Sequence, residues 1–267
     1  MGTSLLDERR RHLAALCACA AGNATGFLAA VQFLTVAPPL VRRPFTAEEL
    51  GRAVGYFPLI GLAIGGFLVG LDRLLTLFLP SSVTSALVLT GWILCSGALH
   101  LDGFLDSCDG LFGGRTPEER LRILRDERIG AFAAIGGFLL LLIQFQSLAA
   151  LSSRSEALLL APVVGRWGMA VAVVAFPYAR AEGLGRALKD HAGWLQALLA
   201  SATAALAAWF AGGRHGPLIL VLSGSLLWLV VRFVLARLPG LTGDIYGALC
   251  QLLEVLVLVA FNASERG

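Results

Sequence analysis

The chain has 267 residues, of which 57% are hydrophobic and 15% are charged. Soluble domains carry about 45–50% apolar and about 25% charged residues, so this composition excludes a disordered chain, a coiled coil and an ordinary soluble enzyme. The net charge of +3, without a basic cluster interleaved with aromatic residues, gives no indication of nucleic-acid binding. We therefore expect an all-α, polytopic membrane helical bundle.

The first segment, residues 1–26, is predicted to be an N-terminal extension. It holds charged residues at 7–11 and then a short apolar run at 13–21. The run is about half a membrane span, which favours an amphipathic helix on the membrane surface over a cleaved signal peptide. Residues 27–267 are predicted to form a single integral-membrane domain.

Seven apolar segments approach the length of about 20 residues that a membrane-crossing helix needs. They are residues 53–71, 83–101, 129–151, 157–177, 192–212, 216–236 and 245–262. A shorter apolar stretch, residues 27–41, contains Pro38-Pro39 and is predicted to be re-entrant or interfacial.

The basic residues alternate between successive loops. If the N-terminus is cytoplasmic, fifteen Lys and Arg residues lie on the cytoplasmic side and four on the opposite side. The remaining two, Arg166 and Arg232, fall within spans. This asymmetry follows the positive-inside rule, so we predict a cytoplasmic N-terminus and a cytoplasmic loop at residues 100–130.

The loop at residues 100–130 is the most charged part of the chain, with 12 of the 39 formal charges. Asp102, Asp106 and Asp109 share one face of a helix that would continue from the second span. Carboxylates in such a row repel one another, and a hard cation such as Mg²⁺ would relieve the repulsion and bind substrate phosphates. The alternative is a solvated helix end at the membrane surface.

A second helix is predicted to begin in the same loop, because Thr116-Pro117-Glu118-Glu119 is typical of a capped helix start. Its basic residues are Arg120, Arg122, Arg125 and Arg128. These arginines suit either the surface of anionic lipid or the phosphates of a substrate, and the sequence leaves both open.

Charged residues inside the spans are candidates for function because each is costly in lipid. Arg166, Arg232 and Glu254 are such residues, and the structural alternative is an ion pair between Arg232 and Glu254. Asp244, at the start of the last span, is predicted either to cap that helix or to face the Asp row across the bundle.

The motifs of the polar loop resemble those of the cobalamin synthase family, which are adenosylcobinamide-GDP ribazoletransferases. The matching strings are HLDGFLDSCDGLFGGR at 100–115 and RDERIG at 125–130. Weaker matches follow at Tyr178–Gly185 and Leu241–Ala248, and the resemblance runs from about Phe27 to the last span. One departure is Gln251, where the family usually carries Glu.

The resemblance implies the reaction. Family members join adenosylcobinamide-GDP to α-ribazole or its 5′-phosphate, release GMP and require a divalent metal, expected here to be Mg²⁺. It further implies a bacterial cytoplasmic (inner) membrane location with the active site facing the cytoplasm. Besides the lipid bilayer, other enzymes of nucleotide-loop assembly are candidate partners.

The resemblance and the charge pattern together give the candidate site residues. The catalytic set is Asp102, Asp106, Asp109, His100, Arg125 and Arg128. The substrate-binding set is Arg166, Arg180, Arg115 and Glu182. The metal ligands are Asp102, Asp106, Asp109, Asp244 and Glu254. One of the three Asp residues, or His100, is expected to accept the proton of the attacking hydroxyl.

Two alternatives come from other classes of protein. A lipid headgroup transferase of the CDP-alcohol phosphotransferase kind also uses Asp residues at helical spacing, but Phe104-Leu105 replaces the Ala-Arg of that pattern. An ion-coupled transporter would use Arg166, Arg232 and Glu254 as its path and would show substrate-dependent flux in liposomes.

Overall fold

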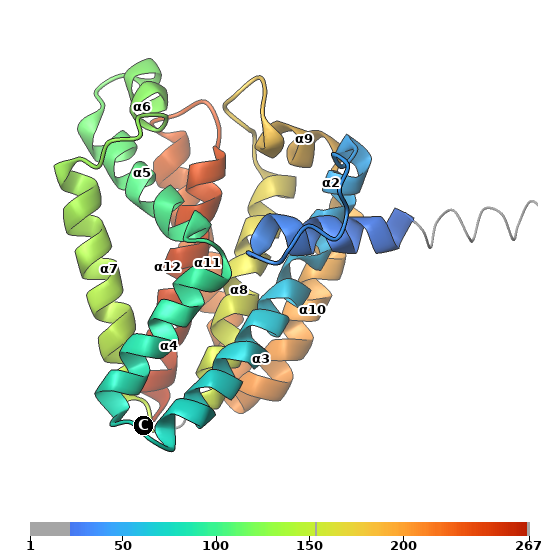
Figure 1. The fold of residues 1–267 in the computed structure, drawn as a ribbon. Helices are drawn as coiled ribbons and strands as arrows, with labels where there is room; N and C mark the ends of the chain where they lie inside the picture. Colours follow the sequence, from blue (N-terminus) through green and yellow to red (C-terminus); the bar gives the residue numbers. More distant parts are fainter. Residues whose placement is uncertain (1–21, 153, 266–267) are drawn as a thin grey trace, which may run out of the picture.

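The computed structural model describes residues 22–152 and 154–265 (Figure 1). Within these residues the secondary structure is helical, and β pairing is limited to one isolated bridge between Tyr178 and Leu241. The predicted all-α class is therefore confirmed. Most of the predicted N-terminal extension, residues 1–21, lies outside the described residues, and a helix covers residues 22–34.

The long helices form the body of the protein. They are α3 (Phe57–Thr76), α4 (Ser81–Cys95), α5 (Leu99–Gly113), α7 (Ala131–Ala150), α8 (Ser155–Ala175), α10 (Trp194–Gly212), α11 (Gly216–Leu235) and α12 (Gly243–Ser264). Shorter helical pieces connect them: α2 (Ala47–Ala53), η1 (Val54–Tyr56), α6 (Pro117–Ile123), α9 (Leu184–His191) and η2 (Gly213–His215).

Five apolar helical stretches in the described chain are long enough to cross a membrane, and the bent pair α4–α5 raises this number to six. One stretch, Trp194–Leu235, contains both α10 and α11. The chain reverses between them, since a Cβ on Gly216 would collide with the Ala208 carbonyl, which lies about 12 Å away in a straight helix. A polytopic membrane fold is thus confirmed, whereas seven crossings and a cytoplasmic N-terminus stay predictions.

Helix α8 lies at the centre of the bundle, in contact with α3, α10 and α12 (Figure 1). Small residues allow this packing: a Cβ on Gly65 of α3 would come within 2.7 Å of the Leu159 carbonyl oxygen. Such close backbone approach is the usual way for helices to associate in lipid, where apolar side chains gain little from burial.

The junction of α4 and α5 corrects one prediction. The second span was expected to continue as a helix through the Asp row, but α4 ends at Cys95 and α5 starts at Leu99 in a direction 88° away. Gly97 and Ala98 both have positive φ, at 59° and 61°, and this left-handed pair ends a helix. Gly97 was the only indication of this break in the sequence, and the continuous apolar residues around it favoured an unbroken helix instead.

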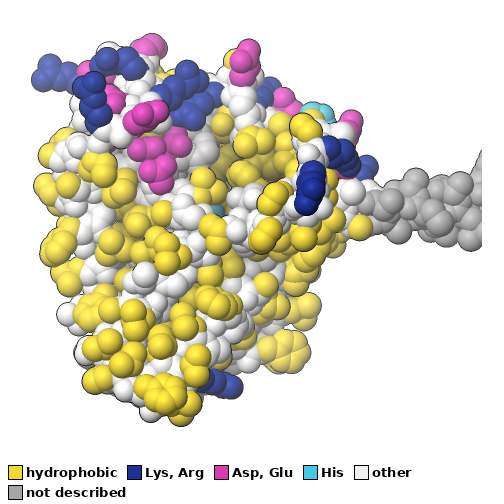
Figure 2. Space-filling view, viewed as in Figure 1, with side chains coloured by type: hydrophobic (Ala, Val, Ile, Leu, Met, Phe, Trp, Pro, Cys, Tyr) yellow, Lys and Arg dark blue, Asp and Glu magenta, His cyan; other side chains and the backbone are white. Residues whose placement is uncertain are grey.

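Most of the charged side chains visible in Figure 2 are gathered at one end of the molecule, over α6, α9 and α2, while apolar side chains are spread over the rest of this face and one basic side chain is visible at the opposite end. This distribution matches a bundle whose apolar belt faces lipid and whose charged end faces water. The charged end contains the polar loop between α5 and α7.

Candidate active site

Two glycines bring α5 and α12 into close contact at the charged end. A Cβ on Gly103 would lie 2.8 Å from the Asp244 carbonyl oxygen, and a Cβ on Gly247 would lie 3.1 Å from the His100 carbonyl oxygen. Any larger side chain would therefore push the helices apart. The close crossing places the Asp row of α5 beside the first turn of α12.

The three Asp residues lie on one helix, as predicted, but they differ in their surroundings. Asp102 is exposed and Asp106 is half-buried. Asp109 is engaged at the start of α7, where its two carboxylate oxygens accept hydrogen bonds from Gly130 N (2.6 Å) and Ala133 N (2.9 Å). Asp109 thus stabilises the positive end of the α7 dipole, a role that the sequence analysis missed.

Asp244 faces the Asp row rather than capping its own helix. Thr242 is the N-cap of α12, and its hydroxyl accepts a hydrogen bond from Ile245 N. The Asp244 carboxylate forms an ion pair with Arg180 at 2.7 Å, and both side chains are about one-fifth exposed. Of the two roles predicted for Asp244, the structure therefore supports the one across the bundle.

The loop after α5 starts a helix where the sequence predicted it. Thr116 caps α6 by accepting from Glu119 N, and Arg115 N donates to the Glu119 carboxylate, which lowers the pKa of Glu119. The helix is shorter than expected, because α6 ends at Ile123. Arg125 and Arg128 consequently lie in the loop that follows and do not share a helical face with Arg120 and Arg122.

Arg125 and Arg180 border two adjoining cavities. The outer cavity, of about 900 Å³, is wide and strongly charged. Its lining is Glu118, Leu121, Arg122, Arg125, Asp126, Glu127, Arg128, Ala179, Arg180 and Ala181. Arg115 is absent from the lining of both cavities, so the structure gives no support to its predicted substrate contact.

The inner cavity, of about 350 Å³, lies between α5, α8, α9 and α12. Its mouth is charged, with Asp102, Arg125, Arg180, Glu182 and Asp244. The rest of its lining is largely apolar and includes Phe33, Phe57, Leu99, Met169, Val173 and Leu188, together with the buried His100. The structure thus brings together five of the predicted site residues at one opening, with His100 beneath them.

Two tyrosines were missed by the sequence analysis. Tyr178 and Tyr246 line the inner cavity and stack on each other, with ring centroids 6.1 Å apart and an interplanar angle of 25°. Burial raises the pKa of the Tyr178 hydroxyl, so this group keeps its proton. A signal existed for Tyr246: a tyrosine inside an apolar span needs a partner for its hydroxyl.

The predicted metal site is only partly assembled. Among the described residues, no group of three His, Cys, Asp or Glu side chains is close enough to hold an ion. Asp109, Asp244 and Glu254 are engaged in other contacts, which leaves Asp102 and Asp106 from the predicted set. Mg²⁺ commonly binds through one or two carboxylates with water and substrate phosphates, so this oxygen donor set fits the ion.

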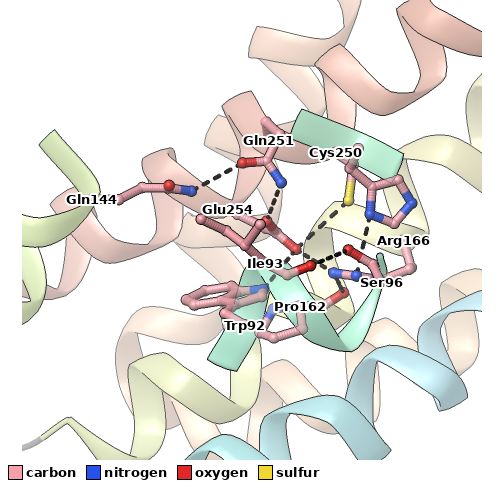
Figure 3. A network of polar contacts seen from close by, with 10 residues as sticks. Trp92, Ile93, Ser96, Gln144, Pro162, Arg166, Cys250, Gln251 and Glu254 are labelled. Carbon is pink, nitrogen blue, oxygen red and sulfur yellow. Dashed lines mark hydrogen bonds and ion pairs between the residues drawn. The ribbon is translucent and has the colours of Figure 1, made fainter. Parts of the chain in front are cut away.

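Glu254 belongs to a separate buried network (Figure 3). It forms an ion pair with Arg166, and the two side chains are 0% and 1% exposed. The predicted pair of Arg232 with Glu254 is therefore wrong: Arg232 lies on α11 with its guanidinium 5.8 Å from the Trp228 ring centroid. Arg166 is nearer to α12 because α8 occupies the bundle centre, a fact that sequence spacing does not reveal.

The buried network also places Arg166 and Glu254 away from the roles predicted for them. Neither residue borders the inner or the outer cavity. Their contacts are with Trp92, Cys250, Gln251 and His100, all from the bundle interior. They do not form the path with Arg232 that the transporter alternative required.

The fold and the site define a class: a multi-pass α-helical membrane protein with paired acidic and basic groups around a cavity at one end. Sequence comparison then gives the family, because residues 26–262 match the cobalamin-5-phosphate synthase family. The chain belongs to this family.

Relatives agree along nearly the whole chain. A protein of Pseudomonas entomophila named adenosylcobinamide-GDP ribazoletransferase is 42% identical over 242 residues, covering 87% of this chain and 96% of its own. Proteins with the same name from Pseudomonas savastanoi pv. phaseolicola and Desulforamulus reducens are 40% and 36% identical, covering 87% and 86% of this chain and 97% and 92% of their own. No solved structure matches the chain.

Proposed function

We propose that this protein joins adenosylcobinamide-GDP to α-ribazole or its 5′-phosphate and releases GMP. A ribose hydroxyl of the ribazole attacks the phosphorus that carries the cobinamide arm. The new P–O bond forms as the bond from that phosphorus to the GMP phosphate oxygen breaks. The products are adenosylcobalamin, or its phosphate, and GMP.

The observation that carries this proposal is the charged opening shared by the two cavities. Asp102 and Asp106 lie on α5, and Arg125 and Arg180 border both cavities. A diphosphate at this opening would have arginine donors for its oxygens and carboxylates on the other side. Phosphoryl transfer depends mainly on such positioning and charge stabilisation.

Mg²⁺ fits a pair of carboxylates on this face of α5: Asp102 lines the inner cavity, Asp106 lies one helical turn further along α5, and these two residues would hold the ion. When bound, the ion supplies charge neutralisation at the phosphate oxygens. The protein's own residues do the rest: Arg180 and Arg125 orient the diphosphate, and Arg128 contacts the departing GMP phosphate from the outer cavity. Asp106 accepts the proton of the attacking hydroxyl.

The outer cavity suits the larger substrate, because a corrinoid cannot enter a cavity of about 350 Å³. Its basic lining would hold the nucleotide diphosphate. The positive-inside pattern supports placing this end at the cytoplasmic side of a bacterial cytoplasmic membrane. There the enzyme could receive its substrates from other enzymes of nucleotide-loop assembly.

The test is a turnover assay on detergent-purified protein with adenosylcobinamide-GDP, α-ribazole 5′-phosphate and Mg²⁺. We expect GMP and cobalamin phosphate in equal amounts, loss of both with EDTA, and recovery with added Mg²⁺. Absence of product from folded protein, with free α-ribazole also tried, would refute the proposed substrates. Lipid headgroup transfer would then be the reaction to assay.

A further inference from the structure

Two buried residues that line the inner cavity each carry a polar atom that lacks a partner within the described residues. His100 is 1% exposed and Tyr246 is 3% exposed, and both side chains line the cavity. His100 Nε2 and the Tyr246 hydroxyl have no hydrogen-bond partner there. Buried polar groups in native proteins are nearly always paired, so two unpaired atoms on residues that line one cavity point to a ligand.

A neighbouring contact determines the tautomer of His100. The Arg166 guanidinium lies 3.3 Å from His100 Nδ1. Arginine has only donors, so Nδ1 must accept, and in the neutral ring the proton is then on Nε2. A protonated ring would place a second cation against Arg166. His100, a residue that lines the cavity, therefore carries its ring proton on Nε2, the atom without a partner among the described residues.

The Arg166 side chain is itself held by a buried hydrogen-bond network that converges on the Glu254 carboxylate (Figure 3). The Gln144 amide donates to Gln251 Oε1 at 3.2 Å, and the Gln251 amide donates to Glu254 Oε2 at 3.0 Å. Glu254 accepts from Arg166, which faces His100 with its other nitrogen. We infer that this network positions His100 and does not contact substrate.

The cavity has the size and lining of a nucleoside site with an apolar base. Its volume of about 350 Å³ is at the small end for ligand sites and far too small for a corrinoid. Phe33, Phe57, Met169 and Val173 supply apolar surface. A guanine base carries several donors and acceptors on its edges, and this lining would leave most of them unpaired.

We propose that the inner cavity binds the benzimidazole base of α-ribazole, and that His100 Nε2–H donates a hydrogen bond to its free ring nitrogen. The alkylated benzimidazole has apolar faces and a single unsubstituted ring nitrogen that accepts a hydrogen bond. These properties match the apolar side chains and the His100 donor that line the cavity. This assignment rests on the proposed function for the identity of the ligand.

The orientation of the ligand follows from the polarity of the cavity. With the base deep inside, the ribose points to the mouth, where Asp102 and Arg180 lie. The attacking hydroxyl is then at the opening where the diphosphate is proposed to bind. The mouth is held in place by backbone hydrogen bonds from Ala179 N to Leu241 O and from Leu241 N to Pro177 O, each 2.8 Å.

The experiment measures binding rather than turnover, with the full chain in lipid nanodiscs and titration calorimetry. The probes are α-ribazole and a matched riboside in which C–H replaces the free ring nitrogen. The wild-type protein should bind the C–H analogue about 10-fold to 100-fold more weakly, because the buried donor is left unpaired.

Variants at His100 identify the donor. His100→Leu should bind both ribosides weakly and about equally, whereas His100→Gln, which keeps an N–H near the Nε2 position, should retain part of the preference. Equal binding of the two ribosides by wild type would overturn the proposal, and so would a full preference in His100→Leu. If His100→Leu does not fold, the comparison of ligands on wild type still decides.

Guanosine and GMP serve as competitors in the same titrations. Displacement of α-ribazole by guanosine, lost in His100→Leu, would assign the cavity to guanine and overturn the proposal. Parallel turnover assays distinguish failure of the proposed reaction from failure of the proposed α-ribazole subsite. Nitrogen-dependent binding without turnover would refute the proposed function alone, and normal turnover without nitrogen dependence would refute this subsite alone.

Discussion

Two ion pairs between arginine and a carboxylate link α8, or the segment that follows it, to α12, and the two pairs differ in burial. Arg166 and Glu254 are 1% and 0% exposed, deep between α8 and α12. Arg180 and Asp244 are 17% and 21% exposed, at the mouth of the inner cavity. In a low dielectric each buried charge needs a partner, so Arg166 and Glu254, the inner pair, serve to neutralise each other within the fold.

Arg180 and Asp244, the outer pair, have further charged residues beside them that their own pairing does not require. Asp102 and Asp106 lie on the adjacent helix, and Arg125 borders the same opening. Charges that are unmatched and near water remain available to a ligand. The comparison therefore separates buried, mutually paired charges from charges near water within a single membrane bundle, and targeted substitutions test whether the two groups differ in function.

The largest effect is expected from Asp106→Asn. Loss of the carboxylate that we propose as proton acceptor and Mg²⁺ ligand should lower turnover about 1,000-fold, equivalent to about 4 kcal/mol of barrier. Membrane insertion and thermal stability should stay near wild type. The measurement is GMP release alongside a melting curve, with the exposed Asp190→Asn on α9 as the matched control. Near-normal turnover would remove Asp106 from the mechanism.

The next effect is on stability. Glu254→Leu leaves Arg166 as an uncompensated buried charge and should destabilise the fold by about 3–5 kcal/mol. The double variant Arg166→Met/Glu254→Leu should recover most of that loss, because no charge remains unpaired. Thermal unfolding in detergent, followed by tryptophan fluorescence, compares the two. A single variant as stable as wild type would contradict the structural role of the inner pair.

A smaller effect on substrate binding is expected from Arg180→Met. The variant loses the proposed phosphate contact and the pair with Asp244, and KM for adenosylcobinamide-GDP should rise about 10-fold to 100-fold. Arg186→Met is the matched control, since Arg186 is an exposed arginine on α9 paired with Asp190. Equal KM values for the two variants would show that Arg180 does not bind the nucleotide substrate.

The smallest effect is expected from Asp109→Asn. This side chain serves the start of α7, and its substitution should cost about 1 kcal/mol of stability. Turnover should fall much less than in Asp106→Asn. Melting curves and initial rates of the two variants, measured together, test the distinction. If Asp109→Asn is as inactive as Asp106→Asn, Asp109 takes part in the chemistry as the sequence pattern first indicated.

Local sequence was sufficient for features that depend on neighbours along the chain. The capped start at Thr116, the all-helical membrane class and the helical row of Asp residues were predicted correctly, because caps and apolar periodicity act within a few residues. The break at Gly97-Ala98 was missed because a left-handed backbone at two adjacent residues has little sequence signal within an apolar segment. The partner of Glu254 was also wrong, since it depends on which helix occupies the bundle centre.

By itself, the sequence determined that this is a helical membrane protein whose charges are most concentrated at residues 100–130, because lipid requires long apolar helices and leaves few places for charge. Tertiary structure decided which charges are available. The crossing of α5 and α12 at Gly103 and Gly247 places Asp102 and Asp106 beside Asp244, while packing around α8 encloses Arg166 and Glu254. The physical reason is that pairing and burial are set by helices distant in sequence.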